Sequence, residues 1–415
     1  MQNIFFRSAP KILYTILVGI LCTFFALLLK KVGEGTERYL FQRIQEHFIW
    51  LLLATPLTGF LLIYFITTKV FKTRISGIRE ILDSLREPIQ VLKPIKAILH
   101  FFTGIFTLVF GGSTGIEVST VVASASIGSW VGQKKKYGDD FKRNLIVAGA
   151  VAGIAGLFKS PLAGLFFGVE VLMVTFSWEL IILSTIAAFV AFGVRYFLDS
   201  EILFHPILHG WRSQAIPFYV MFSVVASFFS VYLTKGVILT KTIFNTRLGE
   251  FKKVWIGGLL LGSIVLLLVP LYGEGYGFIE KLLTSRTLFN NFSGISGIFL
   301  LSILLFLKPL ATSITLGSGG DGGVFAPSLF LGAVAGCLFA QSANYFGANV
   351  VEVNFIIVGM AAILSASLHA PLTGAFLVMS ITGSYELFIP IMLTSVLSSF
   401  LAKKIFPFTV YSYAS

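Results

Sequence analysis

Residues 110–130 read FGGSTGIEVSTVVASASIGSW, and Glu117 is the only fully charged residue between Lys96 and Lys134. Glycines, small residues and aliphatics surround this carboxylate. An ionised residue at the centre of a membrane helix costs roughly 2.5–3.5 kcal/mol on insertion scales, and residues kept there usually line an ion or proton path. Glu117 is therefore the first candidate functional residue of the chain.

The composition is that of an integral membrane protein. Of the 415 residues, 56% are hydrophobic and 12% are charged, and the mean hydropathy is +0.90. So few polar residues cannot cover a soluble core. Apolar runs at 12–29, 48–66, 255–273 and 355–368 lack the alternation of strands and predict helices. The first run has no small-residue cleavage site, so we expect it to be retained.

The net charge of +12 is concentrated in short basic clusters. These are Arg7 with Lys11, Lys69 to Arg74, Lys134 to Lys136, Lys252 with Lys253, and Lys403 with Lys404. Basic loops favour the cytoplasmic face and anionic lipid headgroups, so the charge indicates a bilayer as partner and no nucleic acid. Cys22 and Cys337 lie in apolar runs and are expected as buried free thiols. No metal-ligand spacing occurs among the histidines and cysteines, and no cofactor is expected.

The sequence contains two related halves. VAGIAGLFKSPLAGLFFGVEV (151–171) and AAILSASLHAPLTGAFLVMS (361–380) share a PLxG core whose prolines are 210 residues apart. Repeated halves with Gly- or Pro-interrupted helices are typical of secondary transporters and related pores. We expect one transmembrane domain over 1–415, with repeats at about 1–205 and 206–415.

Two further features of the chain follow from its polarity pattern. The apolar pattern continues to about Phe408, so no soluble regulatory domain is expected at the C-terminal end. The polar stretches 133–143 and 274–291 are the expected loops.

Glycine-rich segments precede both PLxG cores. They are GGSTGIE (111–117) and GSGGDGGVFAP (317–327), and the second predicts a helix start at Pro327. Helix N-termini carry partial positive charge and free N–H donors, so two of them aimed at one point form an anion site. In the first segment Glu117 stands at the helix start, where its carboxylate would occupy the place of an anion.

These motifs resemble the CLC family of chloride channels and chloride/proton exchangers. ISGIR (75–79), GIEVS (115–119), GVFAP (323–327) and PFTVYS (407–412) match the family's ordered signature segments. The likeness extends over about 70–412 and also includes SPLAG, APLTG and GEGYGFIE. It implies two inverted-topology repeats with broken and re-entrant helices, a homodimer, and chloride transport across a cell membrane, with the bacterial inner membrane as the expected location.

The resemblance also implies roles for particular residues. The central anion ligands would be the hydroxyls of Ser76 and Tyr411 and the N–H groups of Val324 and Phe325, and the outer ligands would be the N–H groups of Gly115, Ile116 and Val118. Glu117 would be the gate: ionised, it mimics an anion, and protonated, it leaves and admits chloride, with other halides or nitrate as further candidates. In exchangers this carboxyl also passes protons.

Departures from the family pattern leave coupling open. Ile75 and Arg79 replace a glycine and a proline of the first motif, and Ile116, Val118 and Ser119 replace the arginine, glycine and proline around the gate. The inner glutamate of exchangers is Val171 here, as in many family channels. Glu170, one residue earlier, is an equally good candidate for a structural acceptor and for a proton path. Proton-coupled antiport and passive chloride conduction both remain open.

Two other functions compete with chloride transport. A fluoride exporter of the same fold usually lacks the serine at position 76, so Ser76 disfavours it. GGSTG (111–115) also fits a serine-elbow pattern, which would make the chain an intramembrane protease with Ser113 as nucleophile and His205 or His369 as base. Neither histidine has a catalytic context in the sequence, so we expect no enzyme. Asp321 is expected to cap a helix or to face outer water.

Overall fold

The computed structural model describes residues 2–86, 91–133, 137–172, 177–199, 201–208, 210–284 and 295–413. Its α-helices are α1 Gln2–His47, α2 Thr55–Phe65, α3 Ile78–Arg86, α4 Ile95–Val109, α5 Glu117–Gln133, α6 Gly138–Phe158, α7 Pro161–Glu170, α8 Trp178–Leu198, α9 Ile216–Arg247, α10 Glu250–Leu267, α11 Tyr276–Thr284, α13 Ile295–Gly317, α14 Phe325–Tyr345, α15 Glu352–Leu368, α16 Pro371–Thr382 and α17 Phe388–Ile405. Shorter turns are η1 Ile49–Leu53, η2 Ile66–Val70, η3 Ser213–Ala215, η4 Val269–Leu271 and η5 Tyr385–Leu387. In this part of the chain, seven helices are long and apolar enough to cross a membrane. The all-α membrane fold is confirmed.

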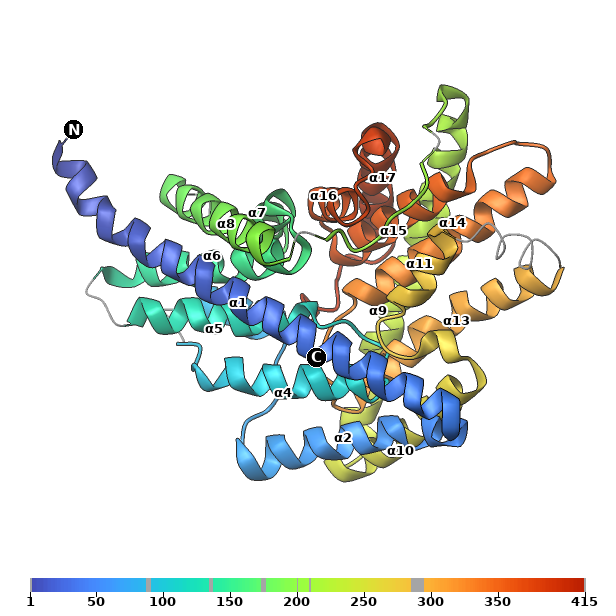
Figure 1. Cartoon of the computed structure of the whole chain (residues 1–415), viewed down its shortest axis with the longest axis horizontal. Coiled ribbons are helices and arrows are strands. Elements are labelled where there is room, and N and C mark those ends of the chain that lie inside the picture. Colours follow the sequence, from blue (N-terminus) through green and yellow to red (C-terminus); the bar gives the residue numbers. More distant parts are fainter. Residues whose placement is uncertain are drawn as a thin grey trace.

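The four apolar runs become helices whose ends follow their prolines. The run 12–29 lies inside α1, which at 1.5 Å per residue is about 69 Å long and extends across the whole molecule (Figure 1). The run 48–66 divides into η1 and α2, because Pro56 is tolerated only in the first turn of a helix. Pro270 likewise ends the run 255–273 in η4, after α10.

The two halves repeat the same packing. Helices α4 to α8 and α13 to α17 correspond in order: α5 packs on α6 as α14 packs on α15, and α6 contacts α8 as α15 contacts α17. The long helix α1 contacts α4, α6 and α8, and α9 contacts α13, α15 and α17 in the same manner. Figure 1 shows the first set on the left and the second on the right. A repeat boundary near residue 205 stays a prediction.

The break before each PLxG helix is also repeated. Lys159 has φ 54° and His369 has φ 53°, both in the left-handed region, and both end a helix. The next residue closes the turn in each case: Ser160 N donates to Ala155 O at 3.2 Å and Ala370 N donates to Ser365 O at 3.0 Å. A proline then starts α7 or α16, whose 10 and 12 residues are too few to span a bilayer. The chain therefore enters and leaves the membrane interior through short broken helices.

Glycines permit close contact between helices α14 and α15. A Cβ added at Gly332 would lie 2.5 Å from the carbonyl carbon of Gly359, and one added at Gly336 would lie 2.5 Å from that of Phe355. These neighbours are main chain and cannot rotate away. Small residues drive helix association in membranes in this way, because the lipid supplies no hydrophobic force between helices.

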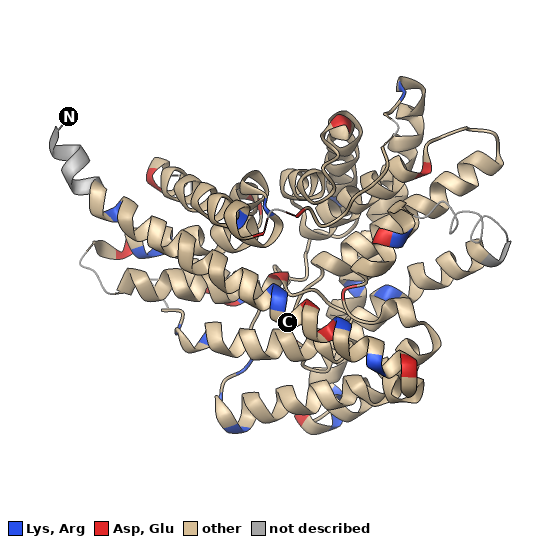
Figure 2. Cartoon of the chain, in the orientation of Figure 1, with Lys and Arg blue, Asp and Glu red and all other residues tan. Residues whose placement is uncertain are grey.

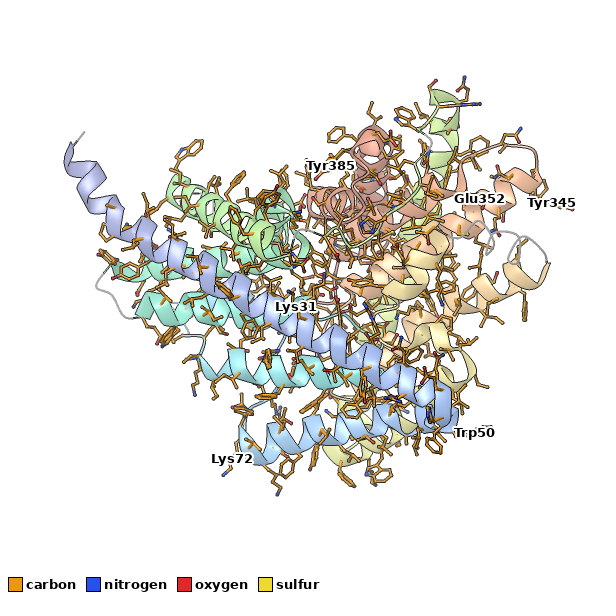
Figure 3. The ribbon with its side chains drawn as sticks, in the orientation of Figure 1. Lys31, Trp50, Lys72, Tyr345, Glu352 and Tyr385 are labelled. Carbon is orange, nitrogen blue, oxygen red and sulfur yellow. The ribbon has the colours of Figure 1, made fainter. Side chains whose placement is uncertain are left out.

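Large apolar side chains cover the outside of the molecule. Phe197, Leu267 and Trp50 are 87%, 81% and 78% exposed, and Figure 3 shows Trp50 at the turn that follows α1. Charged residues occupy few ribbon segments in Figure 2. Such a surface suits lipid rather than water. Cys22 and Cys337 are buried free thiols, as expected.

One of the two expected loops is wrong. Residues 276–284 form α11, because Ile279, Leu282 and Leu283 lie on one helical face and are buried. The rest of that stretch, 285–291, and the basic cluster Lys134 to Lys136 lie outside the described residues. The other loop lies between α5 and α6, whose helical ends take up much of 133–143.

Candidate anion site

The two glycine-rich loops meet at the centre of the fold. Gly115 and Gly323 form an antiparallel bridge, in which Gly323 N donates to Gly115 O at 3.3 Å. The Thr114 hydroxyl donates to Asp321 O at 3.3 Å. Gly322 has φ 134°, a conformation that only glycine adopts readily, and this turns the second loop toward the first. The bridge is what brings the starts of α5 and α14 to one point.

Further hydrogen bonds join the loops to helices of the opposite half. Ser113 N donates to the Thr315 hydroxyl at 3.0 Å, and the Thr312 hydroxyl donates to Ser113 O at 2.9 Å. Asp321 N donates to the Thr107 hydroxyl at 2.8 Å. Each loop is therefore fixed by a helix from the other repeat.

The two helix starts carry the predicted main-chain donors. Helix α5 begins at Glu117, as expected, and Ile116 and Val118 on either side are buried. Helix α14 begins at Phe325 rather than at Pro327, so that prediction is wrong by two residues. The reason is that none of the first four N–H groups of a helix has an intrahelical partner, so proline fits at its third position as well as its first.

The Glu117 carboxylate lies between these helix starts. It is 1% exposed, and its Oε1 accepts a hydrogen bond from the Tyr276 hydroxyl at 2.6 Å. The backbone N–H groups of Glu117 and of Ala326, in the first turn of α14, also face the carboxyl group. Oε2 has no hydrogen-bond partner within 3.5 Å among the described residues. A carboxylate thus occupies the point at which donors of both helices meet.

Gly115 makes room for this position of the Glu117 side chain. A Cβ at Gly115 would overlap Oε2 of Glu117 and lie 2.6 Å from its Cδ. The side chain of Glu117 is therefore folded back over the preceding loop, toward α14.

Tyr411 reaches the same site from the C-terminal segment. Its hydroxyl accepts from Val324 N at a long 3.4 Å, and the residue is 8% exposed. Ser76 is placed differently: its hydroxyl donates to Glu80 and accepts from Lys96 Nζ at 3.0 Å. No hydrogen bond joins Ser76 to Tyr411 in the described part of the chain. The structure thus brings Tyr411 to the donors of α14 and holds the Ser76 hydroxyl in an ionic cluster.

A basic cavity leads to this site. Its volume is about 960 Å³, and Tyr411, Gly323 and Val118 lie at its walls. The basic residues of its lining are Lys72, Arg74, Arg79, Lys241 and Lys253. Figure 3 shows Lys72 at the far end of α2. Two acidic residues, Glu250 and Asp321, also line it, so basic side chains are in excess. We call this the inner cavity, because basic clusters mark the cytoplasmic side and an excess of positive charge concentrates anions.

The family can now be stated from a direct comparison. The family model of the voltage gated chloride channel matches residues 58–403. The chain belongs to this family. It is 30% identical over 405 residues to the H(+)/Cl(-) exchange transporter ClcA of Vibrio parahaemolyticus, a match that covers 91% of this chain and 82% of that protein.

Solved structures confirm the fold of this family member. A slow cyanobacterial Cl-/H+ antiporter superposes with a TM-score of 0.82 at 22% identity, covering 97% of this chain and 95% of the other. A CLC-type fluoride/proton antiporter also gives 0.82, at 21% identity, covering 98% of each chain. The predicted family and the fold of two inverted repeats are confirmed, and the fold alone does not separate chloride from fluoride.

Glu170 has the geometry of a helix cap. Its carboxylate accepts from Leu372 N at 3.1 Å, from Thr373 N at 2.8 Å and from the Thr373 hydroxyl at 2.8 Å, at the start of α16. These bonds satisfy donors that a helix N-terminus leaves free. Val171 is buried. A role of Glu170 in proton movement stays a prediction.

Asp321 contradicts its expected position. The residue is 3% exposed and caps no helix: its Oδ2 accepts from the Thr103 hydroxyl at 2.6 Å and lies 2.7 Å from His100 Nδ1. A buried carboxylate requires such partners, and His100 and Thr103 supply them because they lie one turn apart on α4. The sequence spacing between Asp321 and α4 gave no sign of this contact.

The protease arrangement receives no support from the geometry. Ser113 is fixed through its main chain, and its hydroxyl has no partner among the described residues. No hydrogen bond connects it to His205 or His369 in that part of the chain. His369 instead ends α15 in the left-handed conformation.

Sequence reasoning missed Tyr276, Glu274 and Lys308. Lys308 is fully buried, and its Nζ donates to Gly273 O at 3.0 Å and to Glu274 O at 3.4 Å, which holds the loop before Tyr276. A signal was present, since Lys308 is the only charge between Arg286 and Asp321. The rule that singled out Glu117 applies equally to this lysine.

Proposed function

We propose that this protein transports chloride across the membrane in exchange for protons, with Glu117 as the gate. The observation that supports this is the position of the Glu117 carboxylate between the helix starts of α5 and α14, where it faces the N–H of Ala326. A protonatable anion there competes with a transported anion for the same donors. The exchange transporter named above, with 30% identity over most of this chain, favours antiport over passive conduction.

The proposed cycle needs movement of side chains only, chiefly that of Glu117. When Glu117 is ionised, it holds the donors of both helix starts and excludes chloride. When it is protonated, it loses that attraction and turns away, and chloride from the inner cavity binds the N–H groups of Val324 and Phe325 beside the Tyr411 hydroxyl. The anion then leaves through the outer site, and the side chain returns to the donors as it releases its proton to the inner cavity, so that chloride and proton cross in opposite directions.

The anion ligands proposed are mostly main-chain N–H groups. Gly115, Ile116 and Val118 would serve an outer anion, and Ser76 would act after leaving its contact with Glu80. Such donors recognise charge and size rather than shape, so bromide and nitrate are expected substrates beside chloride. A homodimer in a bacterial inner membrane, with one path per subunit over the single domain 1–415, completes the proposal.

Reconstituted liposomes test the proposal. With a chloride gradient and the membrane potential clamped, protons must move uphill at the expense of chloride. Glu117→Gln must abolish proton movement and keep chloride flux, whereas Glu386→Gln, at an exposed position, must change neither. If the wild type conducts chloride but moves no protons uphill, the protein is a passive chloride channel and not an antiporter. Fluoride flux far above chloride flux would identify fluoride, and not chloride, as the substrate.

A further inference from the structure

Glu274 is a second buried carboxylate beside the gate. It lies in the loop between η4 and α11, and the residue is 4% exposed. Its Oε1 accepts a hydrogen bond from Ile116 N at 3.2 Å. Ile116 N–H is one of the donors proposed above for the outer anion. The Glu274 side chain therefore occupies an N–H donor that the proposed outer chloride would need. Glu117 does the same for donors that lie deeper in the path.

No cation neutralises this carboxyl group at close range. Within the described residues, no lysine, arginine or histidine forms an ion pair with Glu274, and the Lys308 ammonium is bonded to main-chain oxygens. The ionisable groups that face Glu274 from the surrounding elements are Glu34 and Glu37 of α1, Glu117 of α5, Tyr276 of α11 and Lys308 of α13. An isolated buried carboxylate is costly, so a proton or a compensating donor must accompany it.

A water-sized cavity connects Glu274 to the gate and to α1. Its lining includes Glu117, Glu274, Tyr276, Glu34 and Lys30. The space open to a water centre is about 10 Å³, close to what one water needs. The side chains of Glu34 and Lys30 are 26% and 14% exposed, so the far wall of the cavity reaches the surface. Glu34 lies 3.9 Å from Lys30 Nζ, and the other charged groups that face it are Arg38, Arg195 and Asp199. The residues that line this space carry carboxyl, hydroxyl and ammonium groups, which are the partners available to one water.

This surface is on the side opposite the inner cavity. Helix α10 starts beside Lys253, which lines the inner cavity, and its 18 residues rise about 27 Å to Leu267. That length is close to the hydrocarbon thickness of a bilayer. The loop that follows α10 and contains Glu274 is therefore at the outer side.

We propose that Glu274 is a second protonatable gate residue and that, with Glu34, it forms the outer proton port of Glu117. A proton from outer water binds Glu34, passes through the single water to Glu274 and from there to Glu117, and the only covalent bonds formed and broken are O–H bonds. Two carboxyl groups that share a water exchange a proton readily, since O–H···O⁻ pairs are short and strong. Protonated Glu274 is neutral and accepts from Ile116 N–H more weakly, so chloride can compete for this donor at the moment when the proton arrives.

Glu274→Gln is the direct test, and it rests on the proposed exchange. Glutamine keeps an oxygen that accepts from Ile116 N–H, but its amide group does not take up or release a proton. Uphill proton flux should fall by about tenfold or more. This loss should be smaller than the factor of 10²–10⁴ that a positioned proton donor contributes to catalysis, because Glu117 can still take a proton directly from water. Glu34→Gln should also lower the uphill proton flux. Glu46→Gln is the matched control, because Glu46 lies on the same helix α1 with a side chain 62% exposed and outside the cavity lining, and it should behave as wild type.

Sidedness separates this inference from the function on which it rests. Chloride flux of Glu274→Gln should lose its response to outer pH and keep its response to inner pH, which a merely structural role would not produce. Equal proton coupling and equal outer-pH response in Glu274→Gln and wild type would overturn the inference while exchange stands. If the wild type moves no protons uphill, exchange fails, and the response of chloride flux to outer pH alone decides the role of Glu274. Thermal melting of each purified variant identifies those that fail to fold, and for such a variant Glu274→Asp, which keeps the charge, must restore the response.

Discussion

A single methyl group at Gly115 should displace the gate. In the structure an added Cβ would overlap Oε2 of Glu117 and lie 2.6 Å from its Cδ, and the flexible end of the glutamate is what can move. The φ of Gly115 is not among the positive values, so alanine is compatible with the backbone. Gly115→Ala should therefore push the carboxylate out of the position in which it plugs the path.

The size of the effect follows from the bonds that are lost. In its plugged position the carboxylate accepts from Tyr276 at 2.6 Å and faces N–H donors of two helix starts. A hydrogen bond to an ionised group contributes about 1.5–3 kcal/mol. At 1.4 kcal/mol per factor of ten, the ratio of open to plugged protein should rise about ten- to a hundredfold.

The pH dependence of chloride flux measures this ratio. Ionised Glu117 plugs the path, so wild-type flux should fall as the pH rises, and Gly115→Ala should retain most of its acidic flux at pH about 7.5. For each variant the flux at high pH is divided by the flux at low pH. This ratio cancels any loss of flux that arises because the added methyl group narrows the path. Gly277→Ala, where an added Cβ meets nothing within 4 Å, is the control. A pH profile of Gly115→Ala that matches this control would refute the plugged geometry.

Three further changes test other contacts. Tyr276→Phe should raise flux at neutral pH about tenfold by removing the bond to the gate, whereas Tyr272→Phe, whose hydroxyl donates to a neutral carbonyl at 2.5 Å, should leave the pH profile unchanged. Glu170→Gln should lower stability by about 1–2 kcal/mol in thermal melts and leave proton coupling intact, since it caps α16; lost coupling at wild-type stability would make it a proton carrier instead. Gly336→Ala should cost more than about 3 kcal/mol or prevent folding, because the methyl meets the main chain of α15, while Gly193→Ala, in open space on α8, should be neutral or stabilising; equal melting temperatures would disprove the tight contact.

The fold was largely predictable because apolar runs and paired motifs carry local information. The PLxG repeat predicted two halves, and the structure repeats even the left-handed residues Lys159 and His369 at that interval. Helix ends at prolines were predictable only to a few residues, as Pro327 shows. Glu280 and Lys281 raise the polarity of residues 276–284 and so favour a loop there, although the apolar face of α11 is also present in the sequence.

The site was predictable where a residue stands out in its own segment. Glu117 does so, and the structure places it at a helix start. Contacts between distant segments were not predictable, because nothing near Asp321 points to His100, and nothing near Ser76 points to its neighbour Lys96 rather than to Tyr411. Tertiary packing alone decides such pairs.

The hydrogen bonds that join each glycine-rich loop to a helix of the opposite repeat also limit the movements that the molecule can make during transport. Many transporters expose a substrate alternately by rocking one repeat as a rigid body against the other. Here such a rotation would shear the Gly115–Gly323 bridge and the bonds of Ser113 to Thr312 and Thr315 together, and with them the pocket itself. The architecture thus favours a static frame in which only side chains move, Glu117 above all, so conformational probes attached to the helices should register almost no displacement during turnover.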